Sequence, residues 1–281
     1  MTLTQMRSIL RERDLWLTKS LGQNFLHDQN QIDRILDLAE IHPSDRILEI
    51  GPGLGALTAR FASIPDLQAL IIEKDQRLLD WLTEGNLGRR EGFQWLGADA
   101  LKWLKRHPRD WRGWKLVSNL PYSVGSPILV ELGTNPEGPD RLVVTLQLEV
   151  IQRLRARPGS ADYGLLTVLL GLFYQTADWF RVPRGCFFPE PDVDSACLAL
   201  VRRDEPPMSA TETPTYLRLV KRAFGQRRKT LAKSLSGEWS SAAIAEALPS
   251  VGIDLKARPE ELGVPEFVAL AKALAGGTPT G

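Results

Sequence analysis

The chain has 281 residues, of which 43% are hydrophobic and 25% charged, as is typical of a soluble globular protein with one large domain and one small one. A formal net charge of +1 excludes a uniformly basic nucleic-acid binder, so any basic surface must come from local clustering. Two cysteines without a CxxC motif and three scattered histidines argue against a disulfide framework and a structural metal site, and no apolar run is long enough to cross a bilayer.

The N-terminal segment, residues 1–20, has the mixed charge of a helical arm, and these charges interrupt any signal-peptide core. We therefore expect a cytoplasmic protein. The next segment, Gly22-Gln23-Asn24-Phe25-Leu26, combines amide groups with apolar anchors. Taken alone, it is a loop before a helix predicted over Gln29–Glu40, with Asp28 as its N-cap.

The first predicted strand, Arg46–Ile50, ends in the turn Gly51-Pro52-Gly53-Leu54-Gly55, which opens a helix. A strand, a glycine turn and a helix in succession are typical of nucleotide-binding α/β sheets. The spacing is G-x-G-x-G, which differs from the G-x-G-x-x-G of dinucleotide enzymes. Glycines such as Gly51 and Gly53 allow the backbone to approach a ligand closely, although a purely structural turn is the alternative.

Acidic residues follow the next two predicted strands, Gln68–Ile72 and Phe93–Gly97. Glu73, about twenty residues past the glycines, is placed to accept hydrogen bonds from ribose hydroxyls. Asp75 fits better as the N-cap of the following helix. Asp99 is open to two interpretations, an acceptor for an adenine amino group or a simple helix cap.

The fourth predicted strand, Lys115–Val117, leads into a motif that suits recognition of a planar base. Asn119 offers a side-chain carbonyl and Leu120 a backbone carbonyl. Pro121 stiffens the turn, and Tyr122 supplies a flat face for stacking. Two carbonyl acceptors beside an aromatic ring can bind an exocyclic amine, whereas a plain proline turn after a strand is the alternative.

The loop between the last two predicted strands carries two prolines and two aromatic rings, so we expect a rigid connector. Phe187 or Phe188 could form the second face of a base sandwich, or could pack in the core. The elements around this loop are predicted helices over Ser123–Leu132, Val150–Arg157 and Leu165–Tyr174, and strands over Asp140–Glu149, Asp178–Val182 and Ala196–Val201, the last two as an antiparallel pair.

A proline-containing linker, residues 204–209, marks a shift in composition, and Pro214–Ala275 has a helical pattern throughout. We therefore predict a large domain over residues 1–203 and a helical domain over 204–281. Its first half holds the only dense positive patch that we identify in the sequence, which suits either a solvated helix face or phosphate contact. The patch contains Arg218, Lys221, Arg222, Arg227, Arg228, Lys229 and Lys233.

Seven strand candidates alternate with helices, which predicts an α/β fold with a doubly wound, mostly parallel sheet. The glycine turn, the two acidic residues and the Asn-Leu-Pro-Tyr motif would then all lie at the carboxyl edge of that sheet. Their convergence on one edge is a stronger signal of a ligand site than any of the motifs alone.

The motifs together resemble those of the ribosomal RNA adenine N6-dimethyltransferases, and within that family the branch that acts on the small subunit. The resemblance covers nearly the whole chain. It is carried by Gly22-Gln23-Asn24-Phe25-Leu26, Glu49-Ile50-Gly51-Pro52-Gly53, Glu73, Asp99-Ala100, Asn119-Leu120-Pro121-Tyr122, Tyr163-Gly164, Phe187-x-Pro189-x-Pro191-x-Val193-Asp194-Ser195 and Phe224-x-Gln226-Arg227-Arg228-Lys229-Thr230.

The resemblance implies a seven-stranded class I methyltransferase sheet, S-adenosylmethionine as methyl donor, and dimethylation of two adjacent adenosines in a hairpin loop near the 3′ end of 16S rRNA. The expected partner is the immature small ribosomal subunit, and we expect a monomer with no metal and no membrane contact. The implied catalytic residues are Asn119, Leu120, Pro121, Tyr122 and Phe187. The implied cofactor-binding residues are Asn24, Leu26, Gly51, Gly53, Glu73, Asp99 and Asn119, and the implied RNA-binding residues are Arg222, Arg227, Arg228 and Lys229.

The sequence departs from the family pattern at Leu21, Leu148, Glu190 and Asp192, where relatives usually carry an aromatic, a lysine and neutral or basic residues respectively. These changes bear on RNA affinity more than on the chemistry, because the Asn-Leu-Pro-Tyr motif is intact. Three alternatives stay open: an N6-adenine enzyme for large-subunit rRNA or DNA, a non-catalytic binding protein on the same fold, and a nicotinamide dehydrogenase, which the glycine spacing disfavours.

Overall fold

The computed structural model describes residues 2–13, 15, 23–226 and 229–275. The chain divides into two compact units, the first of residues 1–132, 137–151 and 176–202, and the second of residues 133–136, 152–175 and 203–281. The chain changes unit between residues 202 and 203, and two earlier segments also belong to the second unit. The domain bounds 1–203 and 204–281 stay a prediction. Four residues used above, Leu21, Gly22, Arg227 and Arg228, lie outside the described residues.

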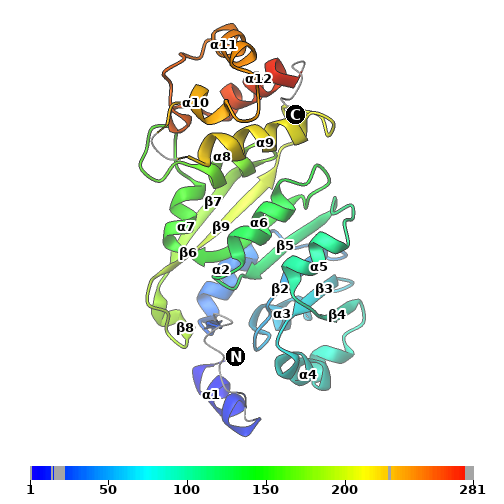
Figure 1. Cartoon of the computed structure of the whole chain (residues 1–281). Coiled ribbons are helices and arrows are strands. Elements are labelled where there is room, and N and C mark those ends of the chain that lie inside the picture. The colour runs from blue at the N-terminus through cyan, green and yellow to red at the C-terminus, as the bar shows by residue number, and fades with distance from the viewer. Residues whose placement is uncertain (1, 14, 16–22, 227–228, 276–281) are drawn as a thin grey trace. The chain divides into compact units, whose positions relative to one another are not determined.

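A seven-stranded sheet forms the first unit, in the order β4-β3-β2-β5-β6-β9-β7 (Figure 1). The five strands from β4 to β6 run parallel, and β9 pairs antiparallel with β6. The predicted doubly wound, mostly parallel sheet is therefore confirmed. The strands are β2 (Arg46–Ile50), β3 (Gln68–Glu73), β4 (Phe93–Gly97), β5 (Trp114–Asn119), β6 (Arg141–Gln147), β7 (Tyr174–Val182) and β9 (Ser195–Arg202).

The central strands are apolar along almost their whole length, as parallel strands covered on both faces must be. In β2, β3 and β6 nearly every residue after the first is buried. The strand order reverses between β2 and β5, so the crevice at their carboxyl ends is the expected ligand position in such a sheet. A separate antiparallel pair joins β1 (Phe25–Leu26) to β8 (Phe187–Phe188).

Aspartates begin three helices of the first unit, because a carboxylate there satisfies backbone N–H groups that have no partner within the helix. Asp28, Asp75 and Asp99 accept from the backbone nitrogens of Gln31, Arg77 and Lys102. The predicted caps at Asp28 and Asp75 are confirmed. The helices up to β7 are α1 (Leu3–Glu12), α2 (Gln29–Ala39), α3 (Ala56–Phe61), α4 (Gln76–Glu84), α5 (Ala100–Arg106), α6 (Gly125–Gly133), α7 (Leu148–Leu154) and α8 (Leu165–Gly171), and the 3-10 turns of the first unit are η2 (Asn86–Arg89) and η3 (Arg184–Cys186).

The second unit is helical where it is described after residue 203, as the sequence pattern predicts. Its buried side chains include Tyr216, Trp239 and Phe267. The hydroxyl of Tyr216 donates to the Val168 carbonyl at 2.8 Å, and the hydroxyl of Tyr163 to the Leu262 carbonyl at 2.7 Å, so both buried phenols are satisfied. Its later elements are α9 (Thr213–Phe224), α10 (Leu231–Leu235), α11 (Ser241–Ser250), η4 (Pro259–Glu261) and α12 (Val264–Ala275).

Candidate active site

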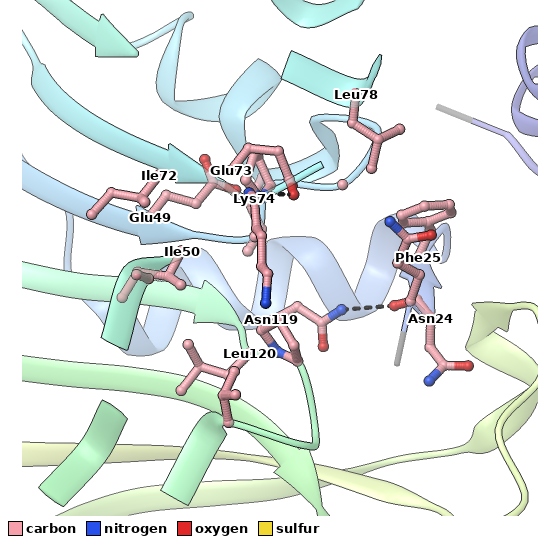
Figure 2. A pocket seen from close by; sticks show the side chains of 18 of the residues that line it. Asn24, Phe25, Glu49, Ile50, Ile72, Glu73, Lys74, Leu78, Asn119 and Leu120 are labelled. Atoms are coloured by element: carbon pink, nitrogen blue, oxygen red, sulfur yellow. Dashed lines mark hydrogen bonds between the residues drawn. The ribbon is translucent and has the colours of Figure 1, made fainter. Parts of the chain in front are cut away.

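A cavity opens at the carboxyl ends of β2, β3, β4 and β5, within the first unit (Figure 2). The structure brings together there nearly all the residues that the sequence singled out, although they come from segments about 100 residues apart. The predicted residues that line it are Asn24, Leu26, Gly51, Gly53, Glu73, Asp99, Asn119, Leu120, Pro121 and Tyr122. Their position is thus as expected, and their individual roles stay predictions.

The amide of Asn119 is held in one orientation. Its Nδ2 donates to the backbone carbonyl of Asn24 at 2.9 Å, a contact drawn in Figure 2. Since that partner is an acceptor, the amide nitrogen faces it and Oδ1 must face the other way. Asn119 Oδ1 is buried and has no hydrogen-bond partner in the structure. A buried acceptor without a donor is costly, so it is suited to a ligand that brings an N–H group.

Tyr122, on the same loop, is held by a hydroxyl pair. Its phenolic oxygen lies 2.5 Å from Ser195 Oγ. Ser195 is the first residue of β9 and is fully buried. Burial raises the pKa of the Tyr122 phenol, so the group is neutral at physiological pH. The hydrogen bond holds the ring of Tyr122 at the cavity, and stacking of the ring on a base stays a prediction.

The glycine turn packs against both neighbouring motifs. Gly51 has φ +68°, and a Cβ there would lie 3.2 Å from Pro121 Cγ. Gly53 has φ +60°, and a Cβ there would lie 2.5 Å from the ring of Phe25. Both backbone conformations are unfavourable for residues with a side chain. The glycines are therefore required for the packing of the two motifs around the cavity, in addition to any approach of a ligand.

Two buried carboxyl groups lie at the tips of β2 and β3. Glu73 Oε1 accepts from the backbone nitrogens of Lys74 and Asp75, at 2.7 and 2.8 Å. Burial raises the pKa of Glu73, and these backbone donors oppose the rise. Burial also raises the pKa of Glu49 to about 8, even though Thr58 Oγ1 donates to it at 2.7 Å, and the neighbouring Glu73 charge adds to the rise.

Asp99 is a helix cap that also lies at the cavity. It caps α5, and its carboxylate also lines the cavity. Lys74 Nζ forms an ion pair with its Oδ2 at 3.0 Å, and this contact holds the pKa of Asp99 below its usual range. The cap is thus confirmed, while hydrogen bonding of Asp99 to an adenine amino group stays a prediction.

Phe187 differs from the expectation. It is only 2% exposed, belongs to a core cluster that includes Leu26 and Val182, and does not line the cavity. Its backbone pairs with Leu26 in the short β1–β8 ladder. The prediction that Phe187 forms the second face of a base sandwich is therefore not supported, because core packing covers the ring. Its neighbour Phe188 is half-buried and lies under the Arg7 guanidinium, 5.2 Å from the ring centre.

The sequence of the chain was compared with protein families and with known proteins. Residues 16–275 match the sequence profile of the family described as ribosomal RNA adenine dimethylase. The chain belongs to this family. It is 40% identical to a "Ribosomal RNA small subunit methyltransferase A" from Pelotomaculum thermopropionicum, over 94% of each chain, and 38% identical to one from Moorella thermoacetica, over 95% of this chain and 96% of the relative.

Two solved structures are similar over most of the chain. The 23S rRNA methyltransferase ErmE has a TM-score of 0.66 and 28% identity, and the alignment covers 90% of this chain and all of that one. A dimethyladenosine transferase from Plasmodium falciparum has a TM-score of 0.74 and 22% identity, covering 89% and 97%. The predicted class I methyltransferase fold is thereby confirmed, and so is an rRNA adenine dimethyltransferase as the kind of enzyme.

The residues of the candidate site that had no role assigned from the sequence include Met6, Lys74 and Ser195. Met6 of α1 and Lys74 both line the cavity, and Ser195 positions Tyr122. Met6 is fully buried in a cluster with Phe25 and Leu54. The amphipathic pattern of the N-terminal segment would have pointed to a buried face that includes Met6, but nothing in the sequence says what that face covers.

The predicted RNA-binding residues of the second unit are only partly described. Lys229 is exposed, and Arg222 is half-buried with its guanidinium directly against Gly237, where a Cβ would lie 1.9 Å from Nη2. Arg227 and Arg228 lie outside the described residues, so their role stays a prediction. Of the acidic departures from the family pattern, Glu190 forms an ion pair with Arg184 at 2.8 Å.

Among the described residues, no three histidine, cysteine, aspartate or glutamate side chains are grouped closely enough to hold a metal ion. In the same part of the chain no helix has the length and apolarity needed to span a membrane.

Proposed function

We propose that this enzyme transfers methyl groups from S-adenosylmethionine to the N6 amines of two adjacent adenosines near the 3′ end of 16S rRNA. The observation that carries the proposal is the buried oxygen of Asn119, which has no hydrogen-bond donor and belongs to a residue that lines the cavity together with Tyr122. An adenine N6 amine carries the N–H group that this acceptor lacks.

The residues around the cavity fit the proposed methyl donor. Asp99 offers a carboxylate at the edge for an adenine amino group, and Glu73 offers one for ribose hydroxyls. The backbone at Gly51 and Gly53 comes to the surface of the cavity without side chains in the way. We assign the binding of the methyl donor, S-adenosylmethionine, to Asn24, Leu26, Gly51, Gly53, Glu73, Asp99 and Asn119. When bound, S-adenosylmethionine supplies a methyl group on a sulfonium centre, which is a good leaving group.

The chain's own contribution to the chemistry is alignment. The N6 amine is a poor nucleophile because its lone pair is delocalised into the ring. We infer that Asn119 Oδ1 and the Leu120 carbonyl accept its two hydrogens and draw the nitrogen towards a tetrahedral shape with a directed lone pair. Pro121 keeps the two carbonyls in place, and Tyr122 stacks on the base. The extra proton leaves to water, so no strong base is required.

The choice of small-subunit rRNA rests on the relatives. Those at 36–40% identity over nearly the full length are named small-subunit methyltransferases, whereas ErmE, at 28%, is a 23S rRNA methyltransferase. We assign the immature small subunit in the cytoplasm as the substrate and expect the enzyme to act as a monomer. We also assign Arg222, Arg227, Arg228 and Lys229 to RNA contact.

The test is mass spectrometry of rRNA after incubation of under-methylated small subunits, and separately of large subunits, with S-adenosylmethionine and enzyme. We expect two adjacent N6,N6-dimethyladenosines in 16S rRNA and none in 23S rRNA. Asn119→Ala should lower the single-turnover rate on the order of 100-fold or more, because it removes a preorganised hydrogen bond at the reacting atom.

Thermal unfolding of the Asn119→Ala variant serves as the control, because the substitution also removes the contact with the Asn24 carbonyl. A folded variant with near wild-type turnover would refute the role of Asn119. Dimethyladenosine found only in 23S rRNA would refute the proposed substrate and favour the large-subunit alternative.

A further inference from the structure

A second basic segment, in addition to the C-terminal patch, follows the cavity residues Asp99–Leu101 in the chain. Residues 102–112 read Lys-Trp-Leu-Lys-Arg-His-Pro-Arg-Asp-Trp-Arg. Five lysines or arginines and a histidine stand there against a single acid, Asp110. This density exceeds the balance of the whole chain, which has 35 basic and 34 acidic residues.

The exposed basic side chains belong to α5 and to the short segment that follows it. Ala100 and Leu104 are buried, which fixes the inward face of the helix. Lys102, Lys105 and Arg106 occupy positions i, i+3 and i+4 of the helix and so share one side of it, and Arg109 stands three residues after the helix ends; all four are exposed. The face begins next to the cavity, because Asp99, Ala100 and Leu101 line it. We call these four residues the α5 basic face.

Most cations of the α5 basic face have no acidic partner among the described residues. Within the described part of the chain, no carboxylate lies within 4.0 Å of Lys105, Arg106 or Arg109, whereas Lys102 is close enough to Asp99 to lower that carboxyl's pKa. Nearby cations are paired: Arg112 bridges Asp110 and Glu137, and Lys115 binds Asp45.

The helix dipole explains only part of the arrangement. It favours cations in the last turn, which accounts for Lys105 and Arg106. It does not account for Arg109, which lies beyond the helix end. Like charges three or four residues apart also repel one another by a few tenths of a kcal/mol. Cations that repel one another within the protein are suited to binding an anion from outside it.

Flat rings accompany the charges. Trp103 and His107 stack with 4.9 Å between ring centres and 19° between planes, and His107 Nδ1 is 2.9 Å from the Trp103 carbonyl. Trp103 is half-buried and His107 exposed. The guanidinium of Arg109 lies 4.7 and 4.9 Å from the ring centres of Trp111 and Trp114, which anchor it at the surface.

We propose that the α5 basic face is a second RNA contact surface, which binds phosphates of the rRNA outside the methylated loop. The inference rests on the proposed rRNA substrate. Cations that phosphates can bridge, beside a partly exposed ring stack, are typical of nucleic-acid surfaces. A protein partner is disfavoured because the large exposed apolar side chains of the described residues, Leu165, Val193 and Leu255, are all elsewhere in the sequence, while protein interfaces have an apolar centre.

The experiment compares Lys105→Glu/Arg106→Glu/Arg109→Glu with a control of equal charge change on exposed residues elsewhere, Arg89→Glu/Lys256→Glu/Lys272→Glu. Binding to naked small-subunit rRNA is measured across a salt titration. For the first variant we expect about tenfold weaker binding near physiological salt, and a slope of log K against log salt reduced by about 2 to 3, since three phosphate contacts each contribute about 0.7–0.9. The control should stay within about twofold of wild type.

Affinity for S-adenosylhomocysteine, measured by calorimetry, should be unchanged in both variants, which shows that the neighbouring cavity is intact. The milder Lys105→Gln/Arg106→Gln variant replaces the first if charge reversal prevents folding, and should reduce the slope by about 1.4 to 1.8. Binding equal to that of the control overturns the proposal. So does a defect seen only with whole subunits, which would indicate a ribosomal protein as partner. Absence of methyl transfer by the wild type tests the proposed function separately, because the binding comparison needs no turnover.

Discussion

Tyr122 shows how a single hydrogen bond can prepare a site for a planar base. Its hydroxyl has Ser195 Oγ as a partner at 2.5 Å, and Ser195 is fully buried at the start of β9. The serine does not line the cavity, so it acts on catalysis only through the orientation of the tyrosine ring.

Ser195→Ala and Tyr122→Phe should each lower the rate of single-turnover methyl transfer about fivefold, which corresponds to a hydrogen bond of about 1 kcal/mol. The double variant should be no slower than either single variant, because both remove the same contact. If the fold loss of rate in the double variant equals the product of the two single losses, the two hydroxyls act independently. The positioning role of Ser195 would then be wrong.

Glu49 should make the stability of the fold depend on pH. Its pKa is raised from 4.5 to about 8 because the carboxyl is buried. A raised pKa means that the protonated form stabilises the fold, fully so below the ordinary value, and that this contribution is lost as pH rises through about 8. The contribution of Glu49 to the melting temperature of the wild type should therefore fall progressively between about pH 4.5 and 8 and level off above pH 8. Glu49→Gln should remove most of that fall, while Glu91→Gln, at an exposed carboxyl, should keep it.

Differential scanning calorimetry at several pH values measures the melting temperatures of the wild type and the two variants. In a unit of this size, each kcal/mol of stability lost should lower the melting temperature by about 2–4 °C. A Glu49→Gln variant whose melting temperature falls as steeply as that of the wild type would show that another group titrates.

At the scale of elements, the glycine turn between β2 and α3 joins three motifs. Gly53→Ala would place a methyl group 2.5 Å from the Phe25 ring at a φ of +60°. We expect a loss of stability of about 2 kcal/mol or more, from backbone strain together with the clash. Adding Phe25→Leu should recover part of the loss if the clash dominates, and none if backbone strain does. Chemical denaturation of the two single variants and the double variant measures this coupling. A Gly53→Ala variant as stable as the wild type would contradict the packing described here.

The sequence predicted elements well where a short apolar run is closed by polar or glycine residues. The bounds of β2 and β4 agree with the prediction, and β3 differs by one residue. The predicted helix over Leu165–Tyr174 instead ends at Gly171, because Tyr174 begins β7 and the apolar run continues across both elements. Periodicity alone cannot separate a buried helix from a buried strand.

The site itself was predictable for a different reason. In a parallel sheet, residues that follow successive strands meet at one edge, so Glu73, Asp99 and Asn119 could be placed together from order alone. Phe187 could not be assigned in this way. Successive residues of a strand face opposite sides, and only the pairing of β8 with β1 decides that Phe187 faces the core while Phe188 does not. The contact of Met6 with the cavity likewise depends on tertiary packing.

At the scale of the whole molecule, a nearly neutral protein has to bind a highly charged substrate. With 35 basic and 34 acidic residues, the long-range field gives little attraction to RNA. Affinity must then come from separate clusters in which cations outnumber acids. The segment from Arg218 to Lys233 and the α5 basic face are two such clusters, and each should contribute its own share of the salt dependence.

Arg227→Glu/Arg228→Glu tests the first of these clusters. Because each lost phosphate contact reduces the slope of log K against log salt by about 0.7–0.9, the double variant should lower it by about 1.4 to 1.8 and weaken binding most at low salt. Fluorescence anisotropy with a labelled fragment from the 3′ end of 16S rRNA measures the slope, with Lys256→Glu/Lys272→Glu as the charge-matched control. If the two clusters bind different phosphates, combining the Arg227/Arg228 variant with reversal of the α5 basic face should add the two reductions in slope. A combined slope equal to that of either variant alone would mean that only one cluster reaches the RNA at a time.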